Sequence, residues 1–193
     1  MKETHLKELT RRPIIFKAAL KLFAGKGIQA TTIRDIAREA RVAEGTLYRH
    51  WRSKDELARE LFCENMRHFK GVLAAEMQGA EGTREKLKRA IKTFYAFAQR
   101  EPLSYRFLIL TPHHELMRLV PKTPKPLDIF FSILTEGIRT GDIKRIDPPF
   151  ACAFVIGAIT KLYDFKRMGI VKKNPASYVD SVTDLLWEAL KAG

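Results

Sequence analysis

The placement of proline is the sequence feature that most constrains how this chain can fold. Of its nine prolines, only Pro13 precedes Pro102, so residues 14–101 contain none of the strongest helix breaker. No segment combines period-two alternation with the β-branched enrichment that is typical of strands. The sequence therefore predicts an all-α fold of about nine helices, with a three-helix head followed by a larger helical body.

Apolar residues at helical spacing, together with capping signals, predict where the helices lie. The first helix has Thr10 as its N-cap and Pro13 in its first turn. Thr32 has the N-cap position of a second helix with an acidic residue in its first turn, and Ser53 to Glu56 have the form of a capping box at the start of a later one. The first helix is expected to end at Gly25 and Gly27, and a short second helix carries Ile33, Ile36, Ala37 and Ala40 inward. Further helices are expected at about 44–50, 54–77, 83–101, 103–110, 115–119, 126–140, 149–168 and 175–191.

The charge of the chain favours a polyanionic partner. Lys and Arg number 35 against 22 Asp and Glu, which gives a net charge of +13. Residues 1–57 hold 13 basic and 7 acidic side chains, so positive charge per residue is about twice as dense there as in the rest of the chain. A surface that is basic everywhere would give similar totals, so charge alone leaves both interpretations open.

Composition indicates a globular, cytoplasmic protein that has no membrane partner. The longest uncharged apolar run, residues 148–160, is shorter than the ~20 residues of a membrane-spanning helix, and residues 1–13 do not have the pattern of a signal peptide. Cys63 and Cys152 are the only cysteines, so neither a disulfide framework nor a four-thiolate zinc site can form. We expect both to be reduced core thiols.

Residues 32–51 have the spacing of a helix-turn-helix motif, with small and polar residues facing outward from the second helix. Gly45 would let the backbone approach base edges, and Arg49 could pair with guanine. Solvated polar residues on a helical hairpin would give the same spacing. The candidates for phosphate contacts in this interpretation are Thr46, Tyr48, His50 and Lys54.

The N-terminal region closely resembles the DNA-binding domain of TetR-family transcriptional regulators. The resemblance extends over residues 12–57 and lies in the segments IIFKAALKLF at 14–23, TTIRDIA at 31–37, GTLYRHW at 45–51 and SKDEL at 53–57. It implies a DNA-binding head, residues 1–53, and a body, residues 54–193, that binds a small effector and dimerises through its last two helices. It also implies base contacts by Glu44, Gly45 and Arg49, and phosphate contacts by Thr32, Thr46, Tyr48, His50 and Lys54.

Three residues depart from the pattern of that family. Arg41 replaces the usual glycine of the turn, where a positive φ costs about 1 kcal/mol, or it adds a phosphate contact. Ala43 replaces the usual Ser or Thr cap of the recognition helix and removes about 1 kcal/mol of helix stability. Trp51 stands where Phe or Tyr is common. We expect these changes to alter backbone contacts and to leave DNA binding intact.

The resemblance implies an effector pocket in the body, and the aromatic content there favours a largely hydrophobic molecule. Plain core packing would account for most of these aromatic residues. We expect a pocket lined by apolar side chains with a few polar groups that orient the ligand. The candidates are Phe62, Met66, His68, Phe69, Phe94, Tyr95, Tyr105, Arg106, His113, Phe130, Phe131 and Tyr163.

The helix expected at 149–168 is apolar almost all round before Lys161, so it must be covered on two sides. We expect it to pair with the final helix in a four-helix contact across a two-fold axis. Gly157 and Ala158 would allow a close approach of the backbones. The candidate interface residues are Phe150, Ala153, Phe154, Gly157, Ala158, Val182, Leu186 and Trp187.

No sequence signature of catalysis is present, and we expect no enzyme, metal or cofactor. Residues 25–30 fit G-x-G-x-x-A but follow a helix instead of a strand, and His113 and His114 lack the helical spacing of metal ligands. The sequence therefore predicts a ligand-responsive, homodimeric repressor of transcription that binds double-stranded DNA at a near-palindromic operator. The alternatives are a basic helical protein that binds anionic membrane or an acidic partner, and a helical enzyme without a signature.

Overall fold

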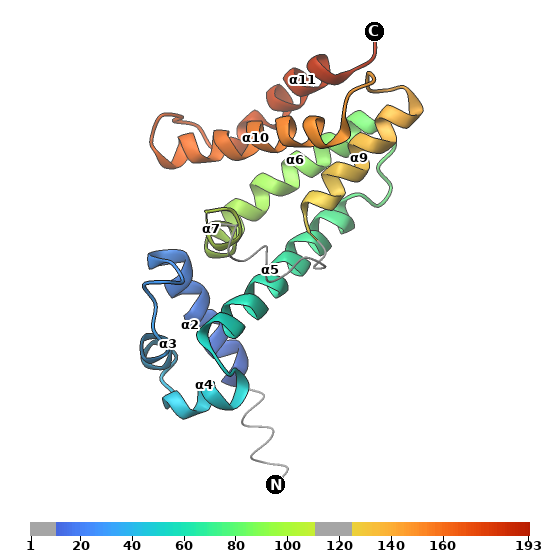
Figure 1. Cartoon of the computed structure of the whole chain (residues 1–193). Coiled ribbons are helices and arrows are strands. Elements are labelled where there is room, and N and C mark those ends of the chain that lie inside the picture. Colours follow the sequence, from blue (N-terminus) through green and yellow to red (C-terminus); the bar gives the residue numbers. More distant parts are fainter. Residues whose placement is uncertain (1–10, 111–124) are drawn as a thin grey trace. The chain divides into compact units, whose positions relative to one another are not determined.

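The computed structural model describes residues 11–110 and 125–193, which form helices and no strands (Figure 1). The predicted all-α fold is confirmed. The helix expected at 115–119 and the N-cap at Thr10 lie outside the described residues. In chain order the elements are α2 (Arg11–Lys26), α3 (Ile33–Ala40), α4 (Glu44–His50), α5 (Lys54–Glu76), α6 (Thr83–Arg100), α7 (Pro102–Leu110), α9 (Leu127–Thr140), α10 (Pro148–Arg167), the 3-10 turn η1 (Pro175–Tyr178) and α11 (Val179–Leu190).

The described chain forms two compact units. The first unit comprises residues 11–66 and 101–110, and the second unit comprises residues 67–100 and 125–193. Helix α5 begins in the first unit and ends in the second, and α7 belongs to the first. The division expected at residue 53 separates functional domains and remains a prediction.

The core of the first unit forms where α2 packs against α3 and α7. The rings of Phe23 and Phe107 stack with centroids 5.9 Å apart, and Phe62 meets Phe107 edge-on at the same distance. Trp51 is 2% exposed and stacks on Phe16 at 5.4 Å. Trp51 is therefore a core residue that anchors the end of α4 to α2.

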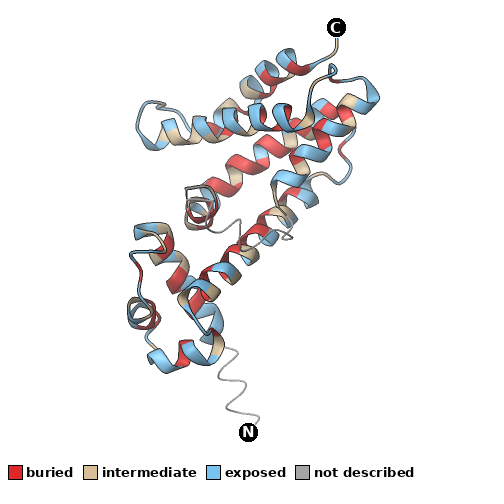
Figure 2. Cartoon of the chain, in the orientation of Figure 1, coloured by how far each residue is buried: buried red, intermediate tan, exposed pale blue. Residues whose placement is uncertain are grey.

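Helix α6 is the central helix of the second unit and packs against α9 and α11. It is buried along much of its length (Figure 2). On the α5 side, the rings of Phe69 and Phe97 stack with centroids 4.0 Å apart. A Cβ atom at Gly137 of α9 would lie 2.6 Å from the Thr83 methyl group, so the close approach of α9 to the start of α6 requires glycine.

Two predicted helix starts differ in detail from the structure. The helix expected at 175–191 begins as the 3-10 turn η1, capped by Asn174, and becomes α-helical only at Val179. At the start of α5, Ser53 accepts the N–H of Glu56 at 3.1 Å as a capping box requires. The Glu56 carboxylate accepts the N–H of Arg52 at 2.6 Å instead of that of Ser53.

Candidate functional site

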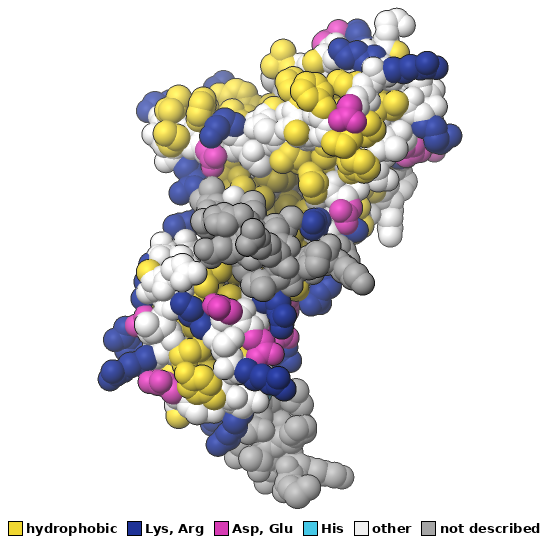
Figure 3. All heavy atoms as spheres, viewed as in Figure 1, with side chains coloured by type: hydrophobic (Ala, Val, Ile, Leu, Met, Phe, Trp, Pro, Cys, Tyr) yellow, Lys and Arg dark blue, Asp and Glu magenta, His cyan; other side chains and the backbone are white. Residues whose placement is uncertain are grey.

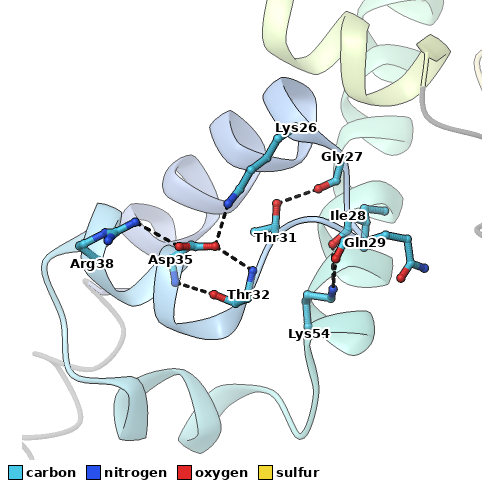
Figure 4. Close-up of polar contacts among 9 residues, drawn as sticks. All are labelled: Lys26, Gly27, Ile28, Gln29, Thr31, Thr32, Asp35, Arg38 and Lys54. Atoms are coloured by element: carbon cyan, nitrogen blue, oxygen red, sulfur yellow. Dashed lines mark hydrogen bonds and ion pairs between the residues drawn. The ribbon is translucent and has the colours of Figure 1, made fainter.

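The start of α3 is fixed by a polar network around Asp35 (Figure 4). The Thr32 hydroxyl accepts the N–H of Asp35, which confirms the predicted N-cap, and the Asp35 carboxylate accepts the N–H of Thr32, both at 3.1 Å, so that the two residues form a capping box. Lys26 and Arg38 pair with the same carboxylate at 2.7 and 3.1 Å. The hydrogen bond from Lys26, followed by that from the Thr32 backbone, holds the pKa of Asp35 far below its usual range. Asp35 is therefore ionised whenever the fold is intact near neutral pH.

The loop that precedes α3 is tied to the first turn of α5 by Lys54 (Figure 4). The Lys54 ammonium donates to the carbonyl oxygens of Ile28 at 2.8 Å and Gln29 at 3.3 Å. In the same loop, the buried Thr31 hydroxyl donates to the carbonyl of Gly27 at 2.7 Å. The sequence identified Lys54 as a phosphate clamp, but two of its three donors hold this loop. A phosphate contact would use the third donor or replace one of these bonds.

The turn between α3 and α4 has a left-handed residue at Arg41, the position where the resemblance implies a glycine. Arg41 has φ 56° and is the only non-glycine residue with positive φ among those described. Its N–H and that of Val42 donate to Arg38 and Ala37, so the carbonyl groups at the end of α3 are satisfied. Ala43 is the N-cap of α4 and provides no side-chain cap. The Arg41 side chain is exposed beside this turn, where it remains available for a phosphate.

Helix α4 presents most of the predicted DNA-contacting residues on its exposed face. Glu44, Gly45 and Arg49 are exposed, and the Tyr48 side chain is 56% exposed. Thr46 is different, because it is 5% exposed and lies with Leu47 on the inward face of the helix. The structure therefore removes Thr46 from the outward surface on which the sequence placed it.

His50 also faces inward more than the sequence predicted. It is half-buried, and its ring lies 5.3 Å from that of Trp51. Its Nε2 atom is buried and has no hydrogen-bond partner within the described parts of the chain. Thr46 and His50 lie four residues apart, directly beside Leu47 and Trp51, so the burial of the latter pair turns both toward the interior.

One exposed cation near this surface was missed from the sequence. Arg34 lies in the first turn of α3, is exposed and has no ion pair among the described residues. A Lys or Arg in the first turn of a helix is unfavourable next to the positive end of the helix dipole. That unfavourable placement is the sequence signal that could have identified Arg34 as a contact to an anion.

The predicted pocket residues separate into buried and exposed groups. In the second unit, Phe69, Phe94, Tyr95 and Phe130 are buried, whereas His68 and Phe131 are exposed. In the first unit, Phe62, Met66 and Tyr105 are buried and Arg106 is half-buried. His113 lies outside the described residues. The exposed positions of His68 and Phe131 make them surface residues of the second unit instead of interior ones.

The hydroxyl of Tyr163 has a structural partner. It donates to the carbonyl oxygen of Ala98 at 3.1 Å. In an α-helix this carbonyl would accept the N–H four residues later, but that residue is Pro102, which has none. Tyr163 therefore satisfies a backbone group at the end of α6, a role different from the ligand contact predicted from the sequence.

One face of α10 is apolar and exposed. Phe150 and Phe154 are 62% and 47% exposed, and Ala153, Gly157 and Ala158 share their face. A Cβ atom at Gly157 would meet no atom within 4 Å. Hydrophobic side chains gather over the surface that the second unit presents in Figure 3. All five α10 residues predicted for the interface are thus accessible.

The residues predicted for the interface on α11 are only partly accessible. Leu186 is 4% exposed and packs in the interior with Val179, Thr183 and Leu190. Val182 and Trp187 are half-buried. The large apolar side chain that faces outward is Leu185, which is 74% exposed. Leu185 therefore replaces Leu186 as the accessible apolar residue of this helix.

Comparisons with known proteins agree with this geometry. Residues 15–61 match the family of bacterial regulatory proteins described as the tetR family. The N-terminal part of the chain is therefore a TetR-family DNA-binding domain. The matched residues run from α2 into α5 and include the whole of α3 and α4.

The similarity to TetR-family proteins continues beyond the head. The fatty acid metabolism regulator protein of Bacillus subtilis is 27% identical over 180 residues, which are 89% of this chain and 91% of that protein. The structure of the Bacillus subtilis regulator FadR with stearoyl-CoA has a TM-score of 0.78 at 27% identity and covers 90% of this chain and 96% of that one. A TetR-family regulator from Marinobacter aquaeolei shares the fold, with a TM-score of 0.85 at 18% identity over 98% of this chain and 100% of that one.

Within the described ranges, no helix is long and apolar enough to span a membrane. The same residues contain no group of three side chains suited to hold a metal ion.

Proposed function

We propose that the chain is a cytoplasmic, homodimeric repressor that binds a near-palindromic operator and is released by a long-chain fatty acyl-CoA. The observation that carries this proposal is the exposed polar face of α4, presented beside the capped start of α3. Arg49 is suited to read a guanine, whereas Tyr48 and Arg41 are suited to hold phosphates. Most of the affinity would come from cations, in keeping with the net charge of +13.

Dimerisation would use the exposed apolar face of α10 together with Leu185 of α11. Phe150, Phe154 and Leu185 expose about half of their surface or more, which is unusual for residues of this size on a soluble monomer. A two-fold contact between such faces would bury them against a second copy. The paired recognition helices would then face two half-sites at least one helical turn apart, which accounts for a near-palindromic operator.

Two kinds of observation support an acyl-CoA effector. The similar FadR protein of Bacillus subtilis was solved with stearoyl-CoA. In this chain, the rings of Phe69, Phe94 and Phe97 form a buried cluster against which an acyl chain could pack. The effector would release the operator only if it binds the DNA-incompetent conformation more tightly than the DNA-bound one.

The proposal is tested by selecting operators from a pool of random duplexes and adding ligands to the resulting complex. A symmetric sequence should be enriched, and its affinity should fall steeply as salt rises. Palmitoyl-CoA should release the labelled duplex, whereas CoA without an acyl chain should not. If the selection enriches no symmetric sequence, the proposal of a near-palindromic operator is wrong. If the complex remains intact at saturating palmitoyl-CoA, an acyl-CoA is not the effector, whereas the proposed DNA binding still holds.

A further inference from the structure

The second unit buries a hydroxyl group that its own described residues leave unpaired. Tyr95 of α6 is 1% exposed, and its hydroxyl oxygen is buried with no hydrogen-bond partner among the described residues. Burial raises the pKa of Tyr95 well above its ordinary value, so the group is protonated and can donate. A buried donor without an acceptor destabilises a fold, and such a group calls for a partner that the chain itself lacks.

The surroundings of Tyr95 make an ordered water a poor partner. The Tyr95 ring meets the Phe94 ring edge-on at 5.8 Å. Of its neighbours three and four residues away on α6, Ile91 and Ala98 are apolar and fully buried, whereas the polar Lys92 and Gln99 are exposed on the surface. A buried water needs two to four polar partners, and one hydroxyl among apolar side chains does not supply them. A ligand that brings one acceptor on an otherwise apolar body fits this environment better.

The described interior of the second unit has no buried cation, and this limits which acceptor a ligand could bring to Tyr95. The buried polar side chains described in the second unit are Thr83, Thr93 and Thr183, and no Lys or Arg is buried among its described residues. A carboxylate placed here would lose its hydration without gaining a cation. A neutral carbonyl oxygen needs only one donor, which Tyr95 provides.

We propose that Tyr95 donates a hydrogen bond to the thioester carbonyl of the acyl-CoA effector and so selects the thioester over the free fatty acid. This inference rests on the proposed function, in which an acyl-CoA is the effector. The acyl chain lies along the cluster of Phe69, Phe94 and Phe97, and the carbonyl stands where the apolar chain ends. One donor then meets one acceptor, and the hydroxyl that is unsatisfied in the free protein is satisfied in the complex.

A pair of ligands that differ only at the carbonyl tests this assignment in the full-length dimer. Palmitoyl-CoA carries the thioester, and S-hexadecyl-CoA replaces its carbonyl group with a methylene group. Calorimetry should show that the wild type binds the thioester about tenfold more tightly, as expected for one buried hydrogen bond. Tyr95→Phe should bind both ligands equally, at the wild-type affinity for the thioether. Tyr163→Phe is the matched control, because its hydroxyl already has a partner, and it should keep the discrimination.

Thermal melting of the free protein gives a second readout that ligand binding does not affect. Tyr95→Phe removes an unsatisfied donor and should raise the melting temperature, whereas Tyr163→Phe leaves the Ala98 carbonyl without a partner and should lower it. A Tyr95→Phe variant that still prefers the thioester, or that melts below the wild type, would overturn the inference. A wild type that binds neither ligand would overturn the proposed effector and this inference together. If the wild type and Tyr95→Phe prefer palmitoyl-CoA over S-hexadecyl-CoA to the same extent, the proposed role of Tyr95 is wrong and the proposed effector still holds.

Discussion

The segment from α2 to α4 and the pair α10–α11 differ in the kind of surface that they expose. Around α3, side chains of the same segment satisfy the helix ends: Thr32 and Asp35 cap the start, and the backbone at Arg41 closes the end. Along α10, by contrast, Phe150 and Phe154 remain exposed with nothing described to cover them. The first region satisfies its polar groups within one chain, whereas the second leaves apolar side chains accessible, as the proposed dimer interface would need.

The largest expected effect comes from charging the exposed face of α10. Gly157→Arg should leave the monomer folded, because the position is exposed and a Cβ atom there meets no atom within 4 Å, but it should place a cation where two copies are proposed to meet. Sedimentation should show a monomer, and operator affinity should fall by about a hundredfold or more as one half-site contact is lost.

Gly71→Arg is the matched control for that variant. Gly71 is an exposed position within α5 that also has open space around it, so the charge change is the same. This control should remain a dimer and bind the operator. A Gly157→Arg protein that is still dimeric and binds DNA would remove α10 from the interface.

The exposed side chains of α4 should differ among themselves in what they contribute. Arg49→Ala should cost about 1–3 kcal/mol on the best operator and little on random DNA, because a base contact carries sequence information. Tyr48→Phe should weaken all duplexes nearly equally, as expected for a phosphate contact. Anisotropy titrations with both duplexes measure this difference. Equal losses on both duplexes for Arg49→Ala would contradict its assignment as a base reader.

The interior of the second unit is tightly packed at Gly137, in contrast to the exposed face of α10. Gly137→Ala would push a methyl group against Thr83, whose hydroxyl is held by Asp142 at 2.7 Å. Overpacking of about 1–3 kcal/mol should exceed the gain of about 1 kcal/mol in helix propensity, so denaturant unfolding should show a net loss of stability. Gly71→Ala in open space should show the gain alone. If Gly137→Ala is more stable than the wild type, the packing between α9 and α6 must relax enough to accept the added methyl group.

The smallest effect concerns the cap of α3 and depends on pH. Because the folded state lowers the pKa of Asp35, the stabilisation is complete above the unfolded pKa of about 3.9 and is lost as the pH falls toward the folded value. Asp35→Asn should therefore lower the unfolding midpoint at pH 7, and its difference from the wild type should shrink below about pH 4. The carboxylate is exposed, so added salt should reduce the difference as well. A difference that does not change with pH would show that charge plays no part in the cap.

The local features of the head could be predicted from sequence because each depends on neighbouring residues. The N-cap at Thr32, with Asp35 in the first turn, depends on residues within three positions, whereas the left-handed turn at Arg41 is indicated by the resemblance to the family. The inward direction of Thr46 and the bond from Lys54 to the loop before α3 could not be predicted in this way. Both depend on packing between segments that are distant in the sequence.

In the body, the helices could be predicted but the direction of individual side chains could not. Leu185 and Leu186 are neighbours with the same chemistry, and the structure exposes the first by 74% and the second by 4%. A shift of one residue along a helix turns a side chain by about 100°, and apolar periodicity does not fix the phase when two stripes are apolar. Tyr95 and Tyr163 likewise look equivalent in sequence, yet only Tyr163 finds a backbone partner, because Pro102 frees the Ala98 carbonyl.

Sedimentation velocity of a fluorescently labelled operator tests the central claim most directly, because it reports stoichiometry and release together. We expect two chains on each duplex. The duplex should sediment alone after addition of palmitoyl-CoA and remain bound after addition of CoA. One chain on each duplex, or a complex that is unchanged by palmitoyl-CoA, would contradict the account of a dimeric, acyl-CoA-responsive repressor.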